Sequence, residues 1–172
     1  MDPRLRQLQD SISSCIRDMS PEQLAWALPE KWNAAQVLEH LLLTYNGTVK
    51  GCERCLEVGK PLAKSPPTLR QRVRITAIVG LGYMPEGRPA PERSRPKGLP
   101  AEKVLAEIGP KIAAMDELLT QCENRYGRVT CLMDHPVLGP LTAQQWRKFH
   151  WVHGRHHVRQ IRAMRAHMEQ EK

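Results

Sequence analysis

Apolar residues recur every three or four positions along most of the chain, which is the period of an amphipathic α-helix. Asn33 and Thr142 each begin a capping box, in which glutamine follows three residues after the capping residue. Ser20, followed by Pro21, indicates the N-cap of a shorter helix. No pair of segments shows a convincing strand pattern, so the sequence predicts an all-α protein. The predicted main helices cover residues 3–18, 34–58, 69–81, 101–124 and the stretch that follows residue 142.

Amphipathic helices joined by loops predict an up-and-down four-helix bundle with an extra short helix and a long basic loop. The loop is expected over residues 82–100, where glycine and proline are frequent and apolar periodicity is lost, and it is expected to be mobile. Gly109 and Pro110 predict a kink in the helix that follows it. A length of 172 residues suits one hydrophobic core, so residues 1–172 are expected to form a single domain.

The apolar runs are all far shorter than the roughly 18 residues needed to cross a bilayer, and no signal-peptide core begins the chain. We therefore expect a soluble, cytoplasmic protein without a membrane partner. Five cysteines, an odd number, argue against a disulfide framework. Cys52 and Cys55 form a CxxC pair, but they lie within an amphipathic helical pattern and are expected to pack rather than to bind metal or exchange electrons.

The formal net charge is +8, and most of it lies in one basic segment, residues 60–97, with nine basic and two acidic residues. Such a segment attracts nucleic acid, an anionic membrane surface or a negatively charged small substrate through the same Coulomb energy. Aromatic residues suited to base stacking do not accompany these charges. A solvated, proline-rich surface loop is therefore the favoured interpretation.

Four of the seven histidines lie between residues 150 and 157. On a helix, His153 and His157 would project side by side, with His150 one turn earlier. A divalent transition metal accepts imidazole nitrogens and needs at least a third protein ligand. His40 lies on the apolar face of an earlier helix, and bundle helices pack about 8–10 Å apart. The sequence therefore predicts a metal site at His40, His153 and His157.

Other polar residues near these histidines have secondary roles in this interpretation. His150 and His135 are reserve ligands, although His135 is expected mainly to stabilise a turn. His156 would lie on a flank of the last helix, as a surface or supporting residue. Trp146 is expected to pack rather than to bind. The candidates for catalytic, supporting or substrate contacts are Gln36, Glu39 and Gln160.

Three sequence stretches together resemble the DinB/YfiT-like superfamily. They are WNAAQVLEHL from Trp32, HPVLGPLTAQQW from His135, and HGRHHVRQI from His153. The second is similar to an uncharacterised branch marked by HP-x-x-G-x-L-T-x-x-x-W. The resemblance implies a four-helix bundle, often a homodimer, with a divalent metal, typically zinc or nickel, held by residues matching His40, His153 and His157.

The resemblance also implies a class of reactions. Some members transfer a low-molecular-weight thiol to an electrophile or are thiol-dependent isomerases, so a metal-dependent thiol S-transferase, or a related hydrolase, is the expected function. This chain differs from a typical member of the superfamily in its basic segment. The resemblance therefore does not indicate which thiol and which electrophile it would use. The alternative is a non-enzymatic metal-containing module that uses the basic segment to bind nucleic acid or an acidic partner.

Overall fold

The computed structural model describes residues 1–85, 87 and 89–170, so Glu86 and Arg88 of the basic segment lie outside the described residues. The described chain is mostly helical, as predicted, with one small sheet. Its elements are α1 (Pro3–Ile16), α2 (Pro21–Ala25), α3 (Ala34–Val58), α4 (Leu69–Ile75), the π-helical turn η1 (Thr76–Gly80), the 3-10 turn η2 (Glu92–Ser94), α5 (Ala101–Tyr126), β1 (Cys131–His135), β2 (Gly139–Thr142) and α6 (Ala143–Gln170).

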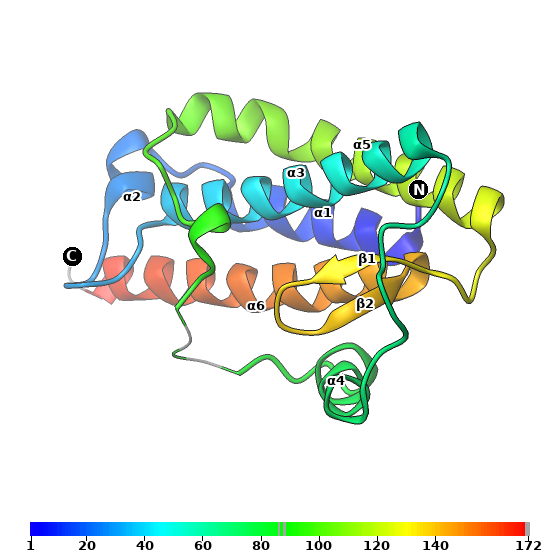
Figure 1. Cartoon of the computed structure of the whole chain (residues 1–172). Helices are drawn as coiled ribbons and strands as arrows, with labels where there is room; N and C mark the ends of the chain where they lie inside the picture. The colour runs from blue at the N-terminus through cyan, green and yellow to red at the C-terminus, as the bar shows by residue number, and fades with distance from the viewer. Residues whose placement is uncertain (86, 88, 171–172) are drawn as a thin grey trace.

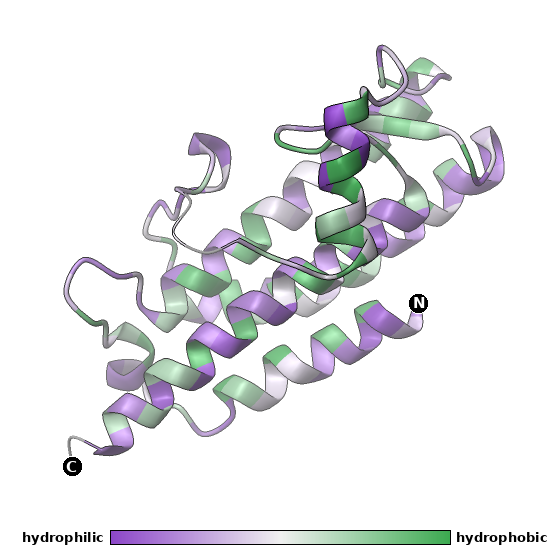
Figure 2. Ribbon diagram, turned by 90° about the horizontal axis from the view of Figure 1, so that it is seen from below, coloured by the Kyte–Doolittle hydropathy of each residue, from purple (hydrophilic) through white to green (hydrophobic). Residues whose placement is uncertain are grey.

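The four long helices α1, α3, α5 and α6 lie alongside one another, whereas α4 stands apart from them (Figure 1). Helix α3 packs mainly on α5 and α1 mainly on α6, while α3 also contacts α6. Hydrophobic and hydrophilic residues alternate in bands along these helices (Figure 2), as expected for helices that bury one face. The fully buried side chains at their shared core include Leu5, Leu8, Leu41, Leu42, Tyr45, Met115 and Leu119.

The capping boxes predicted from the sequence fix where α3 and α6 begin. The Asn33 side chain accepts from the backbone N–H of Gln36 at 2.8 Å, and the Gln36 side chain accepts from the backbone N–H of Asn33 at 3.0 Å. Thr142 and Gln145 make the same reciprocal pair at 3.3 and 2.9 Å. These bonds satisfy amide groups that a helix start would otherwise leave unpaired.

The expectation that the chain has no strand pair is wrong. Strands β1 and β2 pair antiparallel, with His135 opposite Gly139 and Asp134 opposite Pro140. Proline is unfavourable in most strands because it lacks an N–H group, but both strands of a two-stranded sheet are edge strands and tolerate it. The turn-like composition around Pro140 therefore hid a short hairpin that leads directly into α6.

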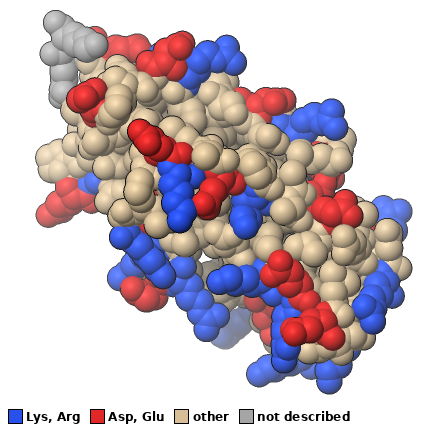
Figure 3. Space-filling view, turned by 90° about the horizontal axis from the view of Figure 1, so that it is seen from above, with Lys and Arg blue, Asp and Glu red and all other residues tan. Residues whose placement is uncertain are grey.

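The basic segment contains more regular structure than a loop. Residues 69–81, predicted as one helix, form α4 and the π-helical turn η1. Residues 82–100, predicted as a mobile loop, include η2, and Ser94 at its end is 8% exposed. Helix α5 is continuous through Pro110. On the face drawn in Figure 3, basic and acidic side chains are interspersed.

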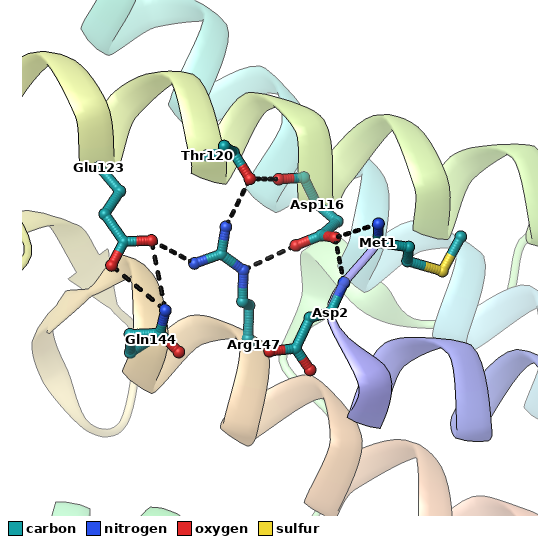
Figure 4. Close-up of a pocket in the computed structure, with 7 residues that line it drawn as sticks. All are labelled: Met1, Asp2, Asp116, Thr120, Glu123, Gln144 and Arg147. Atoms are coloured by element: carbon teal, nitrogen blue, oxygen red, sulfur yellow. Dashed lines mark hydrogen bonds and ion pairs between the residues drawn. The ribbon is translucent and has the colours of Figure 1, made fainter.

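A buried ion network joins α5 to α6 (Figure 4). The guanidinium of Arg147 donates to Asp116 and to Glu123, both at 2.6 Å, and to the hydroxyl of Thr120 at 2.7 Å. The Arg147 side chain is 4% exposed, and those of Asp116 and Glu123 are 6% and 12% exposed. Each nitrogen of the Arg147 guanidinium is therefore paired, which offsets the cost of removing these charges from water.

No helix among the described residues is both long and apolar enough to cross a membrane.

Candidate metal centre

Three histidine rings from two helices meet in the space between α3 and α6. His40 lies in the second turn of α3, and His153 and His157 lie one turn apart near the middle of α6. Nε2 of His153 lies 3.1 Å from Nε2 of His40 and 3.0 Å from Nε2 of His157. One ligand atom from each residue can be chosen so that all three lie within 4.8 Å of one another. Imidazole nitrogens that share an ion at about 2.0 to 2.1 Å lie about 3 Å apart, so this spacing suits a metal.

Hydrogen bonds at the far side of two rings determine which nitrogen carries the proton. Nδ1 of His40 lies 2.7 Å from the backbone carbonyl oxygen of Ser94, and Nδ1 of His157 lies 2.7 Å from Oε1 of Gln160. Because carbonyl oxygens only accept, both Nδ1 atoms donate, and the neutral rings present bare Nε2 atoms to the site. This arrangement of an outer oxygen behind a ligand histidine is characteristic of metal sites.

The three rings have too few protons to satisfy one another. With Nε2 of His40 and His157 unprotonated, a single Nε2 proton on His153 could bond only one of them, and the remaining lone pairs would face each other. Nδ1 of His153 is buried and has no hydrogen-bond partner among the described residues. A cation between the three nitrogens would replace this lone-pair repulsion with attraction.

Burial keeps all three imidazoles neutral. It lowers the pKa of His40, against a smaller opposing effect of the Ser94 carbonyl. It also lowers the pKa of His157 to about 3, and the pKa of His153 falls well below its usual value through burial and its histidine neighbours. Metal ions bind the neutral form of histidine, so these environments favour coordination over protonation.

Aromatic side chains flank the three histidines. The ring of Phe149 stacks on that of His153, with centroids 5.3 Å apart and planes 12° apart. The ring of Trp32 lies 5.2 Å from that of His40. These contacts restrict the orientation of two of the three ligands and make the local environment apolar.

The two reserve ligands do not join the cluster. Nε2 of His150 lies 2.8 Å from the hydroxyl of Thr48, and that hydroxyl also donates to the carbonyl of Thr44 at 3.4 Å. Nε2 of His150 is therefore engaged within the core. Nδ1 of His135 accepts from the backbone N–H groups of Val137 and Leu138, both at 3.1 Å, which is the predicted turn.

The structure gives different roles to the three candidate catalytic residues. Gln160 supports His157, as expected for an outer-sphere residue. Gln36 caps α3, and its carbonyl oxygen is occupied by the Asn33 amide. Glu39 is 1% exposed and accepts from backbone amides of residues 97–99, so neither Gln36 nor Glu39 is oriented as a substrate contact.

The remaining side chains near the site are largely packed. His156 is 8% exposed and receives a hydrogen bond from the Gln160 amide at 3.1 Å, so it supports Gln160 rather than lying at the surface. Trp146 is 5% exposed and packs against neighbouring rings, as predicted. Cys52 and Cys55 are fully buried, and burial contributes to raising the pKa of the Cys55 thiol, which fits a packing role.

Sequence patterns missed the backbone carbonyl of Ser94, which bonds His40. A backbone acceptor leaves no signature in residue type, and Ser94 lies in a segment whose composition indicates a loop. Only the fold brings it to His40.

Fold and site together define a mainly helical protein with a largely buried three-histidine group that could hold a metal ion. The chain belongs to the family described as protein of unknown function DUF1569, whose model matches residues 3–164. No curated protein and no solved structure matches the chain.

Proposed function

We propose that this chain is a metal-dependent enzyme that binds zinc or nickel through His40, His153 and His157. We further propose that its long helices form a DinB/YfiT-like four-helix bundle, and that the reaction is transfer of a low-molecular-weight thiol to an electrophilic small molecule, or a related hydrolysis. The observation that carries the proposal is the convergence of three neutral imidazoles, two buried and one half-buried, on one point.

The number of protein ligands favours catalysis over a purely structural metal. Structural zinc sites are usually closed by four protein ligands, whereas catalytic sites leave a position for water or substrate. Within the described part of the chain, the group that could hold an ion has three members, and His135 and His150 bond elsewhere. A bound ion would therefore keep at least one position for an exchangeable ligand.

A metal ion held by His40, His153 and His157 would lower the pKa of a bound thiol or water and so would make a nucleophile available near neutral pH. The protein contributes the rest. Ser94 and Gln160 hold His40 and His157 with their Nε2 atoms facing inward. Phe149 and Trp32 make the surroundings apolar, which strengthens electrostatic interactions with the nucleophile.

A thiol-transfer assay tests the reaction. Zinc- and nickel-loaded protein would be incubated with glutathione, bacillithiol or mycothiol and a chromogenic electrophile, with chelator-treated protein and His153→Ala as controls. We expect thiol consumption only in the metal-loaded wild type. Equal rates in the metal-loaded wild type and in both controls would contradict the enzymatic proposal.

The exposed arginines Arg70, Arg72 and Arg74 of α4 favour a second candidate, a binding module for nucleic acid or an acidic partner. Such binding would weaken steeply as salt concentration rises and would show little sequence preference. No binding to mixed-sequence DNA or RNA at low salt would exclude the nucleic-acid form of this candidate.

The predicted homodimer is tested separately by sedimentation equilibrium.

A further inference from the structure

Glu39 is a buried carboxylate immediately before the proposed ligand His40, and its hydrogen-bond partners lie in the segment before α5. Oε1 accepts from the backbone N–H of Lys97 at 2.7 Å, and Oε2 accepts from those of Gly98 and Leu99 at 3.1 and 3.2 Å. Hydrogen bonds from neutral amides to an ionised carboxylate are stronger than neutral pairs. Glu39 therefore anchors this segment firmly.

The next residue on α3 binds the same segment. The ring of His40 donates to the carbonyl of Ser94. Residues 94–99 thus form a strap held by two consecutive residues of α3, one of which is a proposed metal ligand. The strap joins η2 to the start of α5 and belongs to a stretch that is otherwise rich in proline and glycine.

The shape of the strap depends on one glycine. Gly98 has φ +84, a left-handed conformation that glycine adopts without strain and other residues adopt at a cost. Gly98 is the middle one of the three successive residues whose backbone amides donate to Glu39. Consecutive backbone N–H groups turned toward one side form an anion-binding concavity, here filled by a side chain of the same protein.

We propose that Glu39 is a positioning residue for the metal centre. By holding residues 97–99 it fixes the Ser94 carbonyl, and that carbonyl holds the His40 ring in the orientation and tautomer that bind metal. Metal binding and docking of the strap therefore stabilise each other, and thermodynamic reciprocity requires each to strengthen the other by the same factor. This inference rests on the metal site of the proposed function.

The first experiment compares Glu39→Gln with the matched variant Glu57→Gln, which removes the same charge from an exposed position on the same helix. Zinc affinity is measured by competition with a chromophoric chelator, and the ligand field by the absorption spectrum of the cobalt(II)-loaded protein. Loss of outer-sphere support typically weakens metal binding by about 10- to 100-fold. We expect that loss and an altered cobalt spectrum in Glu39→Gln, and neither in Glu57→Gln.

The second experiment follows the strap itself by limited trypsin digestion. Trypsin cuts after Arg93 and Lys97, while the bond after Arg95 is protected by Pro96. In the wild type, zinc is expected to slow these cuts about 10- to 100-fold. This factor is similar to the loss of zinc affinity expected for Glu39→Gln. In Glu39→Gln the protection by zinc should largely disappear.

Gly98→Ala provides an independent variant in case Glu39→Gln does not fold. A Cβ at Gly98 meets no atom within 4 Å, so the change strains only the strap backbone. It should weaken zinc binding and increase cleavage in the same direction. Unchanged zinc affinity in both variants, or cleavage that zinc does not slow in the wild type, would overturn the proposal. Wild-type protein that binds no zinc or cobalt would instead contradict the proposed function on which it rests.

Discussion

Nε2 of His153 lies 3.1 Å from Nε2 of His40, although 113 positions separate the two residues. The contact depends on the packing of α3 against α6, because no local segment of the chain contains both rings. His157, one turn further along α6, completes the group. The proposed site can therefore be disrupted from either helix.

Replacing His153 or His157 by alanine should abolish stoichiometric metal binding. Each change leaves two imidazoles, fewer than the three ligands that catalytic zinc sites usually have. Metal content would be measured by mass spectrometry on protein purified without chelator or a metal-binding tag. The exposed His167 on the same helix provides the matched control, because His167→Ala should leave metal content unchanged. Unchanged metal in His153→Ala would contradict the site.

Gln160→Ala should weaken zinc binding by about 10- to 100-fold without abolishing it, since it removes the oxygen that fixes Nδ1 of His157. The site keeps all three ligands, so stoichiometry at saturating metal should stay the same. Titration with a competing chelator separates the two quantities. Gln121→Ala, on the exposed surface of α5, should have no effect.

The metal-free protein should lose stability as pH falls below about 6.5, the usual pKa of histidine in an unfolded chain. Burial lowers the pKa of His150 to about 3 and that of His135 to about 4. Between pH 6.5 and these values the unfolded chain binds protons that the folded chain does not. The free energy of unfolding is therefore not reduced by these histidines above pH 6.5. Below pH 6.5 it falls as the pH falls, by about 1.4 kcal/mol per pH unit for each such histidine.

Urea unfolding of chelator-treated protein between pH 7.5 and 5 measures this slope. His150→Leu removes one of the responsible groups and should make the slope shallower. A free energy of unfolding that does not depend on pH in this range would contradict the assignment of neutral buried histidines.

Arg147→Ala should destabilise the protein by about 3–5 kcal/mol, because it removes the buried cation that lies between the carboxylates of Asp116 and Glu123. Arg128→Ala is the matched control. Arg128 also pairs with Glu123, at 3.6 Å, but its side chain is 82% exposed. Exposed ion pairs contribute about 0–1 kcal/mol, so the control should change little. Chemical denaturation of both variants measures the difference.

Two helical glycines should respond oppositely to alanine. A Cβ at Gly154 on α6 would approach the buried side chain of Leu8 on α1 to 2.5 Å, so Gly154→Ala should cost about 1–3 kcal/mol through overpacking. A Cβ at Gly47 on α3 would meet nothing within 4 Å. Gly47→Ala should therefore stabilise the helix by up to about 1 kcal/mol. Thermal unfolding of the two variants tests both signs.

The long helices and the three histidines could be predicted from the sequence because their signals are local. The apolar period, the capping boxes at Asn33 and Thr142, and the spacing of His153 and His157 each reflect chain geometry over a few residues. The addition of His40 required the further assumption that two helices pack face to face. The structure places the three rings together, as predicted.

What could not be predicted depends on partners that lie far away in the sequence or on backbone atoms. The sequence makes Glu39 a candidate for catalytic, supporting or substrate contacts, but it does not indicate its partners, which are backbone amides near Gly98 and carry no side-chain signal. The same is true of the Ser94 carbonyl behind His40. The β1–β2 hairpin was missed because Pro140 and the neighbouring turn residues outweighed two very short strands.

Because the proposed metal ligands lie on two separate helices, the availability of metal should affect how fast the protein is degraded. An ion bound by both α3 and α6 stabilises only the folded state, by about 4 kcal/mol when free metal exceeds the dissociation constant a thousandfold. Proteases degrade mainly the open forms of a protein, whose population falls about tenfold for each 1.4 kcal/mol. With such an ion at His40, His153 and His157, metal starvation would therefore also speed the degradation of this protein.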